Sequence, residues 1–341
     1  DMYIDLAGKW NISLEADAGH QSGSIELPGI LQANGYGNPI TKETPWISTL
    51  HDTFWHEQEE YKYAQEDGVN VPFLSQPPKH FMGVATYERE ITVPESEEEW
   101  YFHVEAARWR SEIFIDGQRK GGDCTVCAPH HVKLGKLTEG NHRLTVILDN
   151  SMIYPYRPDA HGVSDALGVT WNGMVGEMAL FTEVEEQARK EAKHRYALTH
   201  PKTVEAKDGR FYIDGNPFYF RATHFGGEYP LTGYPSTDKN WWRKMIRTIK
   251  EWGLNGIRFH SYCPPEAAFA VADEENIALL VECGMWNHFE DGIPMLEVLR
   301  EETRRILEQF GHHPSFVLFS PTVPLVPLEL FPLLSGATTT L

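Results

Sequence analysis

The feature that most constrains the fold is an alternation of short apolar strands with amphipathic helices, which begins near residue 209. A first strand is predicted to end near His224, and further strands are predicted over 254–263, 278–287 and 315–320. Helices are predicted between them over 236–253, 264–277 and 294–311. In the first of these helices the apolar residues recur at helical spacing and Gly253 closes the pattern. Strands that alternate with helices predict a parallel sheet or a (β/α) barrel.

Residues 1–183 show a different pattern, in which apolar and polar residues alternate over short runs. Such runs occur at 83–93, 100–109, 111–118 and 142–150. Alternation at a period of two turns one face of a strand inward, and Asp116-Gly117 is a hairpin-turn dipeptide. The pattern predicts an all-β sandwich domain over 1–183, and the charged segment after it predicts a linker over 184–208.

Charge limits the partners that this chain can bind. The 341 residues include 30 Lys and Arg against 49 Asp and Glu, which gives a net charge of -19. Such an acidic protein is not expected to bind nucleic acid or an anionic membrane, and the charge is compatible with a neutral or weakly charged substrate. No apolar run reaches about 18 residues, so no membrane span is predicted. The compartment stays open between cytoplasmic, periplasmic and secreted.

The cysteines favour neither a disulfide framework nor a metal site. Cys124 and Cys127 have the spacing of half a zinc site, but no second such pair follows them. Cys263 and Cys283 lie more than a hundred residues further along the chain. We therefore predict no metal and no cofactor.

Polar side chains gather where the predicted strands end. Functional side chains of (β/α) barrels lie at these carboxyl ends, so polar groups that end consecutive strands are expected to converge. The predicted substrate-binding residues are His224, Arg258, His260, Tyr262, Trp286 and Asn287. Glu282 and His260 are the candidates for catalysis.

Several stretches resemble glycoside hydrolase family 2, which includes β-galactosidases and β-glucuronidases. The segment NGIRFHSYCPPEAAFAVADEENI resembles the family's Asn-x-Ile-Arg-x-x-His-Tyr-Pro stretch and the later Asp-Glu-x-Gly-Ile, with His260 one place early and Asn276 at the Gly. FRATHF resembles the first barrel strand, whose sugar-contacting His matches His224. DLAGKW and MGVATYEREITVP resemble the N-terminal jelly roll, and HHPSFVLFSPT resembles the fourth barrel strand.

The resemblance implies a multidomain fold of β plus α/β type, in which a jelly-roll β-sandwich precedes a TIM barrel. Two departures change this expectation. The linker at 184–208 stands where the family has an immunoglobulin-like domain. The family's acid/base Asn-Glu is replaced by Thr322-Val323, and the later strand with the nucleophile is missing. We therefore expect residues 209–341 to form a partial, half TIM barrel of about four strands with an atypical C-terminal tail, truncated before both catalytic carboxylates.

Three functions remain open. The first is a family 2-like protein that acts on or binds β-linked carbohydrate, with Glu282 as the replacement acid/base if it turns over. The second is a non-catalytic carbohydrate-binding protein. The third is an esterase-type hydrolase in which Ser261 or Ser320 is activated by His224 or His260, although the sequence has no Gly-x-Ser-x-Gly elbow. The partner is a carbohydrate or small-molecule substrate, and a homo-oligomer is expected to cover the open half barrel.

Overall fold

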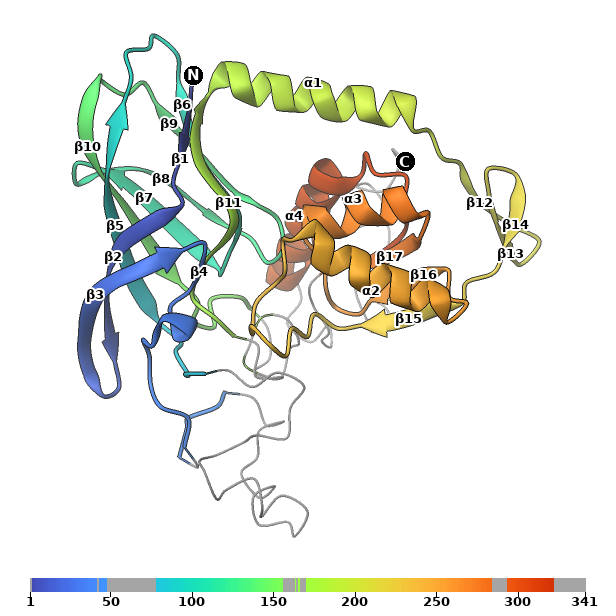
Figure 1. Ribbon diagram of the computed structural model, residues 1–341, viewed down its shortest axis with the longest axis horizontal. Coiled ribbons are helices and arrows are strands. Elements are labelled where there is room, and N and C mark those ends of the chain that lie inside the picture. Colours follow the sequence, from blue (N-terminus) through green and yellow to red (C-terminus); the bar gives the residue numbers. More distant parts are fainter. Residues whose placement is uncertain are drawn as a thin grey trace. The chain divides into compact units, whose positions relative to one another are not determined.

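A computed structural model of the protein describes residues 2–41, 43–47, 78–155, 163, 165, 170–283 and 293–321. The chain divides into two compact units, one made of 1–187 with 228–235 and the other of 188–227 with 236–341 (Figure 1). No helix in the described ranges is long and apolar enough to cross a membrane.

The first unit contains two antiparallel sheets. The smaller sheet has the order β1 (Tyr3–Asp5), β11 (Gly173–Thr182), β6 (Trp100–Ala107) and β9 (His130–Gly135), and β4 (Gly29–Ile30) also pairs with β11. A 3-10 helix, Gln32–Asn34, follows β4. The larger sheet has the order β3 (Gly19–Leu27), β2 (Gly8–Ala16), β5 (Val84–Val93), β10 (Gly140–Asp149), β7 (Arg110–Ile115) and β8 (Gln118–Cys124).

Alternation along the strands builds the core between these sheets. On β2, every second residue from Trp10 to Leu14 is buried, and on β6 the same holds from Trp100 to Val104. These side chains belong to one apolar cluster that draws on both sheets. The β character predicted for this part of the chain is therefore confirmed for the residues that the structure describes, while the bounds 1–183 and the jelly-roll connectivity stay predictions.

The hairpin predicted at Asp116-Gly117 joins β7 to β8. Both residues have positive φ angles, 51° and 80°, as a two-residue turn of the mirror-image type requires. The Asp116 carboxylate also accepts a hydrogen bond from the backbone N–H of Arg143 at 2.8 Å. The turn is thus held by its own sequence and by the neighbouring strand.

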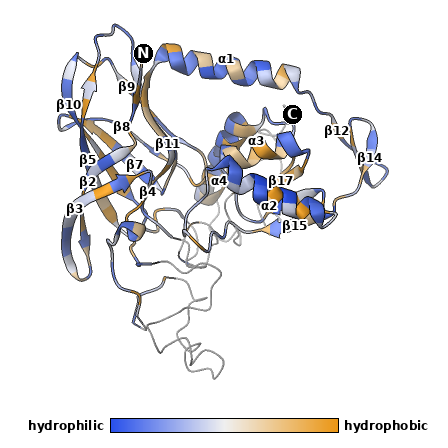
Figure 2. Cartoon of the chain, in the orientation of Figure 1, coloured by the Kyte–Doolittle hydropathy of each residue, from blue (hydrophilic) through white to orange (hydrophobic). Residues whose placement is uncertain are grey.

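The segment predicted as a linker is largely helical. Helix α1 (Glu183–Thr199) has no buried residue, and hydrophilic residues cover much of it (Figure 2). Three glutamates, Glu183, Glu185 and Glu186, lie in its first turn, where they interact favourably with the helix dipole. A linker role for 184–208 stays a prediction.

The second unit contains two sheets. Strand β12 (Val204–Lys207) forms a small antiparallel sheet with the hairpin of β13 (Arg210–Ile213) and β14 (Asn216–Phe218). The other sheet is parallel and has the order β15 (Ala222–Phe225), β16 (Gly256–Phe259), β17 (Ala278–Glu282) and β18 (Phe316–Ser320). Helices α2 (Lys239–Glu251), α3 (Glu266–Glu275) and α4 (Ile293–Phe310) connect its strands.

This arrangement confirms the predicted alternation of strands and helices around a parallel sheet. Helix α2 begins after Asp238, whose side chain caps it by accepting a hydrogen bond from the Asn240 N–H. Its Trp242 and Ile246 are fully buried. The interpretation of the sheet as half of a TIM barrel stays a prediction, and the predicted atypical tail after Pro321 lies outside the described residues.

Candidate functional site

The register of the parallel sheet brings several predicted site residues to the same end of the strands. His224 on β15 lies opposite Arg258 on β16, and Glu282 is the last residue of β17. Beyond β16, the chain turns through His260 and Ser261. We call His224, Arg258, His260, Ser261 and Glu282 the Glu282 cluster.

The Glu282 carboxylate is the centre of this cluster. Its Oε1 accepts a hydrogen bond from Arg258 Nε at 2.9 Å, and Arg258 Nη2 lies at the same distance from Oε1. Its Oε2 accepts a hydrogen bond from the Ser261 backbone N–H at 2.7 Å and lies 3.3 Å from His260 Nδ1. Both oxygens of Glu282 are therefore occupied by protein groups.

Burial distinguishes the two charged members of the cluster. The side chain of Glu282 is only 2% exposed, whereas that of Arg258 is 42% exposed. A buried carboxylate is stable when it is paired and hydrogen-bonded, as this one is. The carboxylate thus lies inside the unit, while part of the guanidinium reaches solvent.

The turn after β16 has a backbone that a residue with a side chain rarely adopts. Ser261 has a φ of 52°, in the left-handed region, and its residue is 3% exposed. The hydrogen bond from its N–H to Glu282 compensates for this unfavourable conformation. Glu282 therefore fixes the path of the chain between β16 and α3, and with it the position of His260.

His260 connects the carboxylate to His224. Its Nδ1 lies 3.3 Å from Arg258 Nη2, and its ring centroid lies 5.1 Å from that of His224. Burial lowers the pKa of His260; the Glu282 charge opposes this effect, and the Arg258 and His224 charges add to it. A neutral imidazole is able to accept a hydrogen bond from the guanidinium at Nδ1.

The lowered pKa of His260 predicts a pH effect on stability. The folded state binds this proton less readily than the unfolded chain does, so the contribution of neutral His260 is fully present above about pH 6.5 and is lost as the pH falls through the lowered pKa. We expect His260→Asn to reduce the loss of thermal stability between about pH 7 and pH 5. Thermal unfolding of both proteins at several pH values measures this, and identical pH dependence would contradict it.

The other predicted site residues have different environments. Tyr262 is 6% exposed, and its ring lies 6.2 Å from the rings of both Phe225 and Phe259. A Cβ on Gly227, whose φ is 87°, would lie only 3.0 Å from the Tyr262 ring. This packing favours a supporting role for Tyr262 against Phe225 and Phe259. Trp286 and Asn287 lie outside the described residues.

Sequence reasoning did not assign the Ser261 backbone to the site. It considered only the hydroxyl of Ser261, yet the Oγ atom is buried and has no hydrogen-bond partner in the described part of the chain. The Ser261 N–H points at Glu282 because Ser261 has a positive φ. A serine in a sequence does not indicate a positive φ, so this contact could not be predicted.

The fold of the chain is similar to that of solved β-glucuronidases. Neither a family sequence model nor a curated protein matches the sequence. Among solved structures, a β-glucuronidase from Ruminococcus gnavus in complex with D-glucaro 1,5-lactone is similar with a TM-score of 0.66 at 11% identity, covering 99% of this chain and 70% of that chain. A β-D-glucuronidase for Dictyoglomus thermophilum is similar with a TM-score of 0.62 at 13% identity, covering 98% and 70%. At these identities the likeness shows the fold alone.

Proposed function

We propose that this protein binds a β-linked carbohydrate at the carboxyl ends of β15, β16 and β17, as a glycoside hydrolase family 2-like protein. The observation that carries the proposal is the buried Glu282 carboxylate, which positions Arg258, His260 and the Ser261 turn. Carbohydrate sites combine a few well-positioned polar groups with aromatic surfaces. Among the structures of similar fold, the Ruminococcus gnavus enzyme is in complex with D-glucuronic acid in one case, which makes β-glucuronides the first class to test.

Arg258 is the residue best placed to meet a sugar. Glu282 and His260 engage its Nε and Nη2 atoms, so the Nη1 hydrogens have no partner within the described ranges. Because its side chain is 42% exposed, these hydrogens are available to a ligand oxygen. Because the Glu282 charge compensates the Arg258 charge, the ligand oxygen that Arg258 binds in this proposal belongs to a sugar hydroxyl or to a uronate carboxylate.

Glu282 is proposed as a positioning residue in place of the predicted acid/base. Its two oxygens already accept hydrogen bonds from Arg258 and from the Ser261 backbone N–H. Retaining glycosidases use two carboxyl groups about 5–5.5 Å apart, and the Glu282 cluster as defined contributes one. Binding is therefore the activity that the described geometry supports best. Trp286 and Asn287 remain proposed ligand contacts.

Arg258→Ala is expected to weaken sugar binding by about 10-fold or more, since a hydrogen bond to a charged group contributes roughly 1.5–3 kcal/mol. Titration calorimetry with methyl β-glucuronide and methyl β-galactoside measures the affinities. The matched control is Arg243→Ala, because Arg243 also pairs with a glutamate, Glu274, but on the surface of α2 and α3. Failure of the wild type to bind either sugar, or equal affinity in Arg258→Ala, would contradict the proposal.

Turnover is tested separately with nitrophenyl β-glucuronide and β-galactoside. We expect no release of nitrophenol that depends on Glu282, because both of its oxygens already accept hydrogen bonds from protein groups. Release that persists in Glu282→Gln would place catalysis on other carboxylates.

The esterase alternative receives no support from Ser261. A serine nucleophile needs a general base within hydrogen-bond reach, and Ser261 Oγ has no partner among the residues that the structure describes.

The edges of the parallel sheet support the proposal that the protein forms a homo-oligomer. Strands β15 and β18 are the outer strands of the parallel sheet as described, and unpaired sheet edges are commonly covered by another chain or segment.

A further inference from the structure

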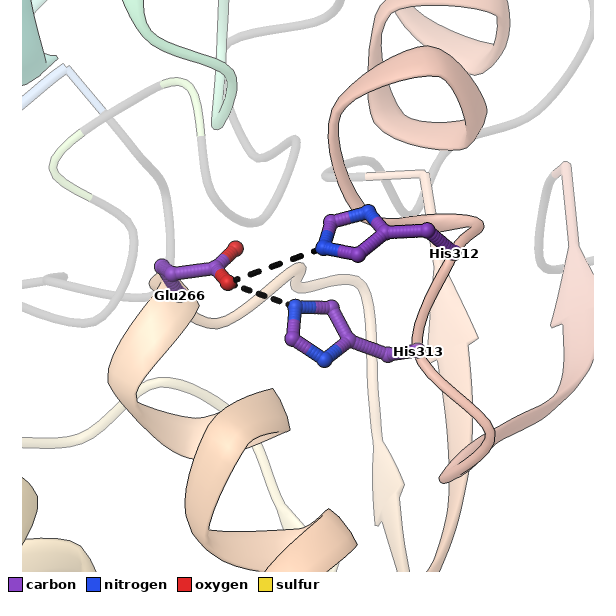
Figure 3. A group of neighbouring side chains, drawn as sticks. All are labelled: Glu266, His312 and His313. Carbon is purple, nitrogen blue, oxygen red and sulfur yellow. Dashed lines mark hydrogen bonds and ion pairs between the residues drawn. The ribbon is translucent and has the colours of Figure 1, made fainter. Parts of the chain in front are cut away.

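A second cluster of titratable side chains lies in the parallel-sheet unit and shares no residue with the Glu282 cluster. Glu266 is in the first turn of α3, and His312 and His313 lie in the turn between α4 and β18 (Figure 3). Glu266 Oε1 lies 2.6 Å from His313 Nε2 and 3.9 Å from His312 Nε2. One possible ligand atom from each of the three residues lies within 4.8 Å of the others.

The orientation of His313 is fixed by a carboxylate behind it. Its Nδ1 lies 2.6 Å from Asp273 Oδ2, which leaves Nε2 directed at Glu266. Asp273 is itself held by hydrogen bonds at 2.9 Å from the Ser315 N–H and from the Tyr196 hydroxyl. A metal-ligating histidine usually donates its other ring N–H to a carboxylate, as His313 does to Asp273. A metal ion at Nε2 has to replace the proton that this nitrogen shares with Glu266.

Two polar atoms of the cluster have no protein partner. Glu266 Oε2 and His312 Nδ1 are buried and make no hydrogen bond within the described part of the chain. Most buried polar atoms in proteins are satisfied by protein, water or an ion, so the unsatisfied Glu266 Oε2 is available to a further group. The His312 nitrogen that faces Glu266 is Nε2, on the other side of the ring from Nδ1. The Glu266 side chain is 40% exposed, against 13% for His312, so the cluster is open to solvent on the glutamate side.

We propose that Glu266, His312 and His313 bind a divalent zinc ion. Two imidazoles and one carboxylate are typical zinc ligands, with bonds of about 2.0–2.2 Å, and a fourth position is left for water. Tetrahedral bonds of that length separate ligand atoms by roughly 3.3–3.6 Å. The 2.6 Å contact of Glu266 with His313 has to lengthen and the 3.9 Å separation from His312 has to shorten, both by side-chain adjustment.

The bound ion has a structural role, because it joins the start of α3 to the turn before β18. Without an ion, the hydrogen bonds of His313 to Glu266 and Asp273 hold the same elements together. The absence of a metal was predicted from cysteine spacing, to which Glu266, His312 and His313 do not contribute. The pairing of Glu266 with His312-His313 becomes evident only when α3 lies beside β18.

Titration of the metal-free protein with zinc tests the proposal. We expect one equivalent to bind, and His312→Ala and Glu266→Gln each to weaken binding by about 100-fold or more. The matched control is His200→Ala, which removes a neighbouring histidine that stacks on Tyr196 at 4.1 Å but is no proposed ligand. Cobalt substitution distinguishes the site from the thiols of Cys124 and Cys127, because thiolate ligands add charge-transfer absorption and this site does not.

Hydrogen exchange of the unmutated protein gives a second readout that does not depend on the folding of any variant. Zinc should slow amide exchange over 266–275 and over the turn that contains His312 and His313. Absence of saturable binding, binding that is unaffected in both His312→Ala and Glu266→Gln, or protection confined to other segments would each overturn the proposal. None of these outcomes depends on whether the Glu282 cluster binds sugar.

Discussion

Replacement of Glu282 by alanine is expected to destabilise the parallel-sheet unit by about 2–4 kcal/mol. Its buried carboxylate is the acceptor for Arg258 and for the Ser261 N–H, and the side chain is only 2% exposed. Removal leaves the left-handed Ser261 turn without its hydrogen bond. Part of the cost is avoided because Arg258 can turn toward solvent. Urea denaturation followed by far-ultraviolet circular dichroism measures the loss.

Two further variants make this result specific. Glu282→Gln retains an acceptor of the same size and should cost less than Glu282→Ala. Glu274→Ala removes a glutamate that is 44% exposed and pairs with Arg243, so it should change stability by no more than about 1 kcal/mol. If Glu274→Ala is as damaging as Glu282→Ala, the buried carboxylate does not have the central position assigned to it.

Replacement of Trp242 by alanine is expected to cost about 3–5 kcal/mol, the range for large buried aromatic residues. Trp242 is 0% exposed, and its ring lies 5.9 Å from Phe225 and 6.1 Å from Phe259. Its Nε1–H also donates a hydrogen bond to the Ser236 carbonyl at 2.7 Å. The residue therefore packs α2 against the first two strands of the parallel sheet.

The chain offers a matched control for this prediction. Trp252 lies at the C-cap of the same helix and is 80% exposed. Trp252→Ala should change stability by about 0.5 kcal/mol or less. Chemical denaturation of the two variants compares them directly, and similar losses in both would show that α2 does not pack as described.

The predictable part of the fold is the part in which burial imposes a period on the sequence. The helix predicted over 236–253 is observed as Lys239–Glu251, with apolar residues at helical spacing and a start set by Asp238. Helix α1 was not predicted, because it has no buried residue and so no apolar face to reveal it. Its glutamates, alanines and lysines have strong intrinsic helix propensity. The segment was nevertheless predicted as a linker because it is charged and has few large apolar residues.

The candidate site was predictable in part, because the carboxyl ends of parallel strands lie at the same edge of a sheet. His224, Arg258 and Glu282 come together through strand register, as the sequence predicts. The partners of Glu282 were not predictable, because the Ser261 N–H reaches it only through a positive φ. The cluster of Glu266, His312 and His313 was not predicted for a similar reason, since it depends on how α3 packs beside the turn before β18.

The most direct test of the central claim is a crystal structure of the protein soaked with D-glucaro 1,5-lactone, the ligand of a glucuronidase with a similar fold. The account predicts lactone density in contact with Arg258 at the carboxyl ends of β15, β16 and β17, with the pairing of Arg258 to Glu282 preserved. Lactone bound only elsewhere, or bound after displacing Arg258 from Glu282, would contradict it.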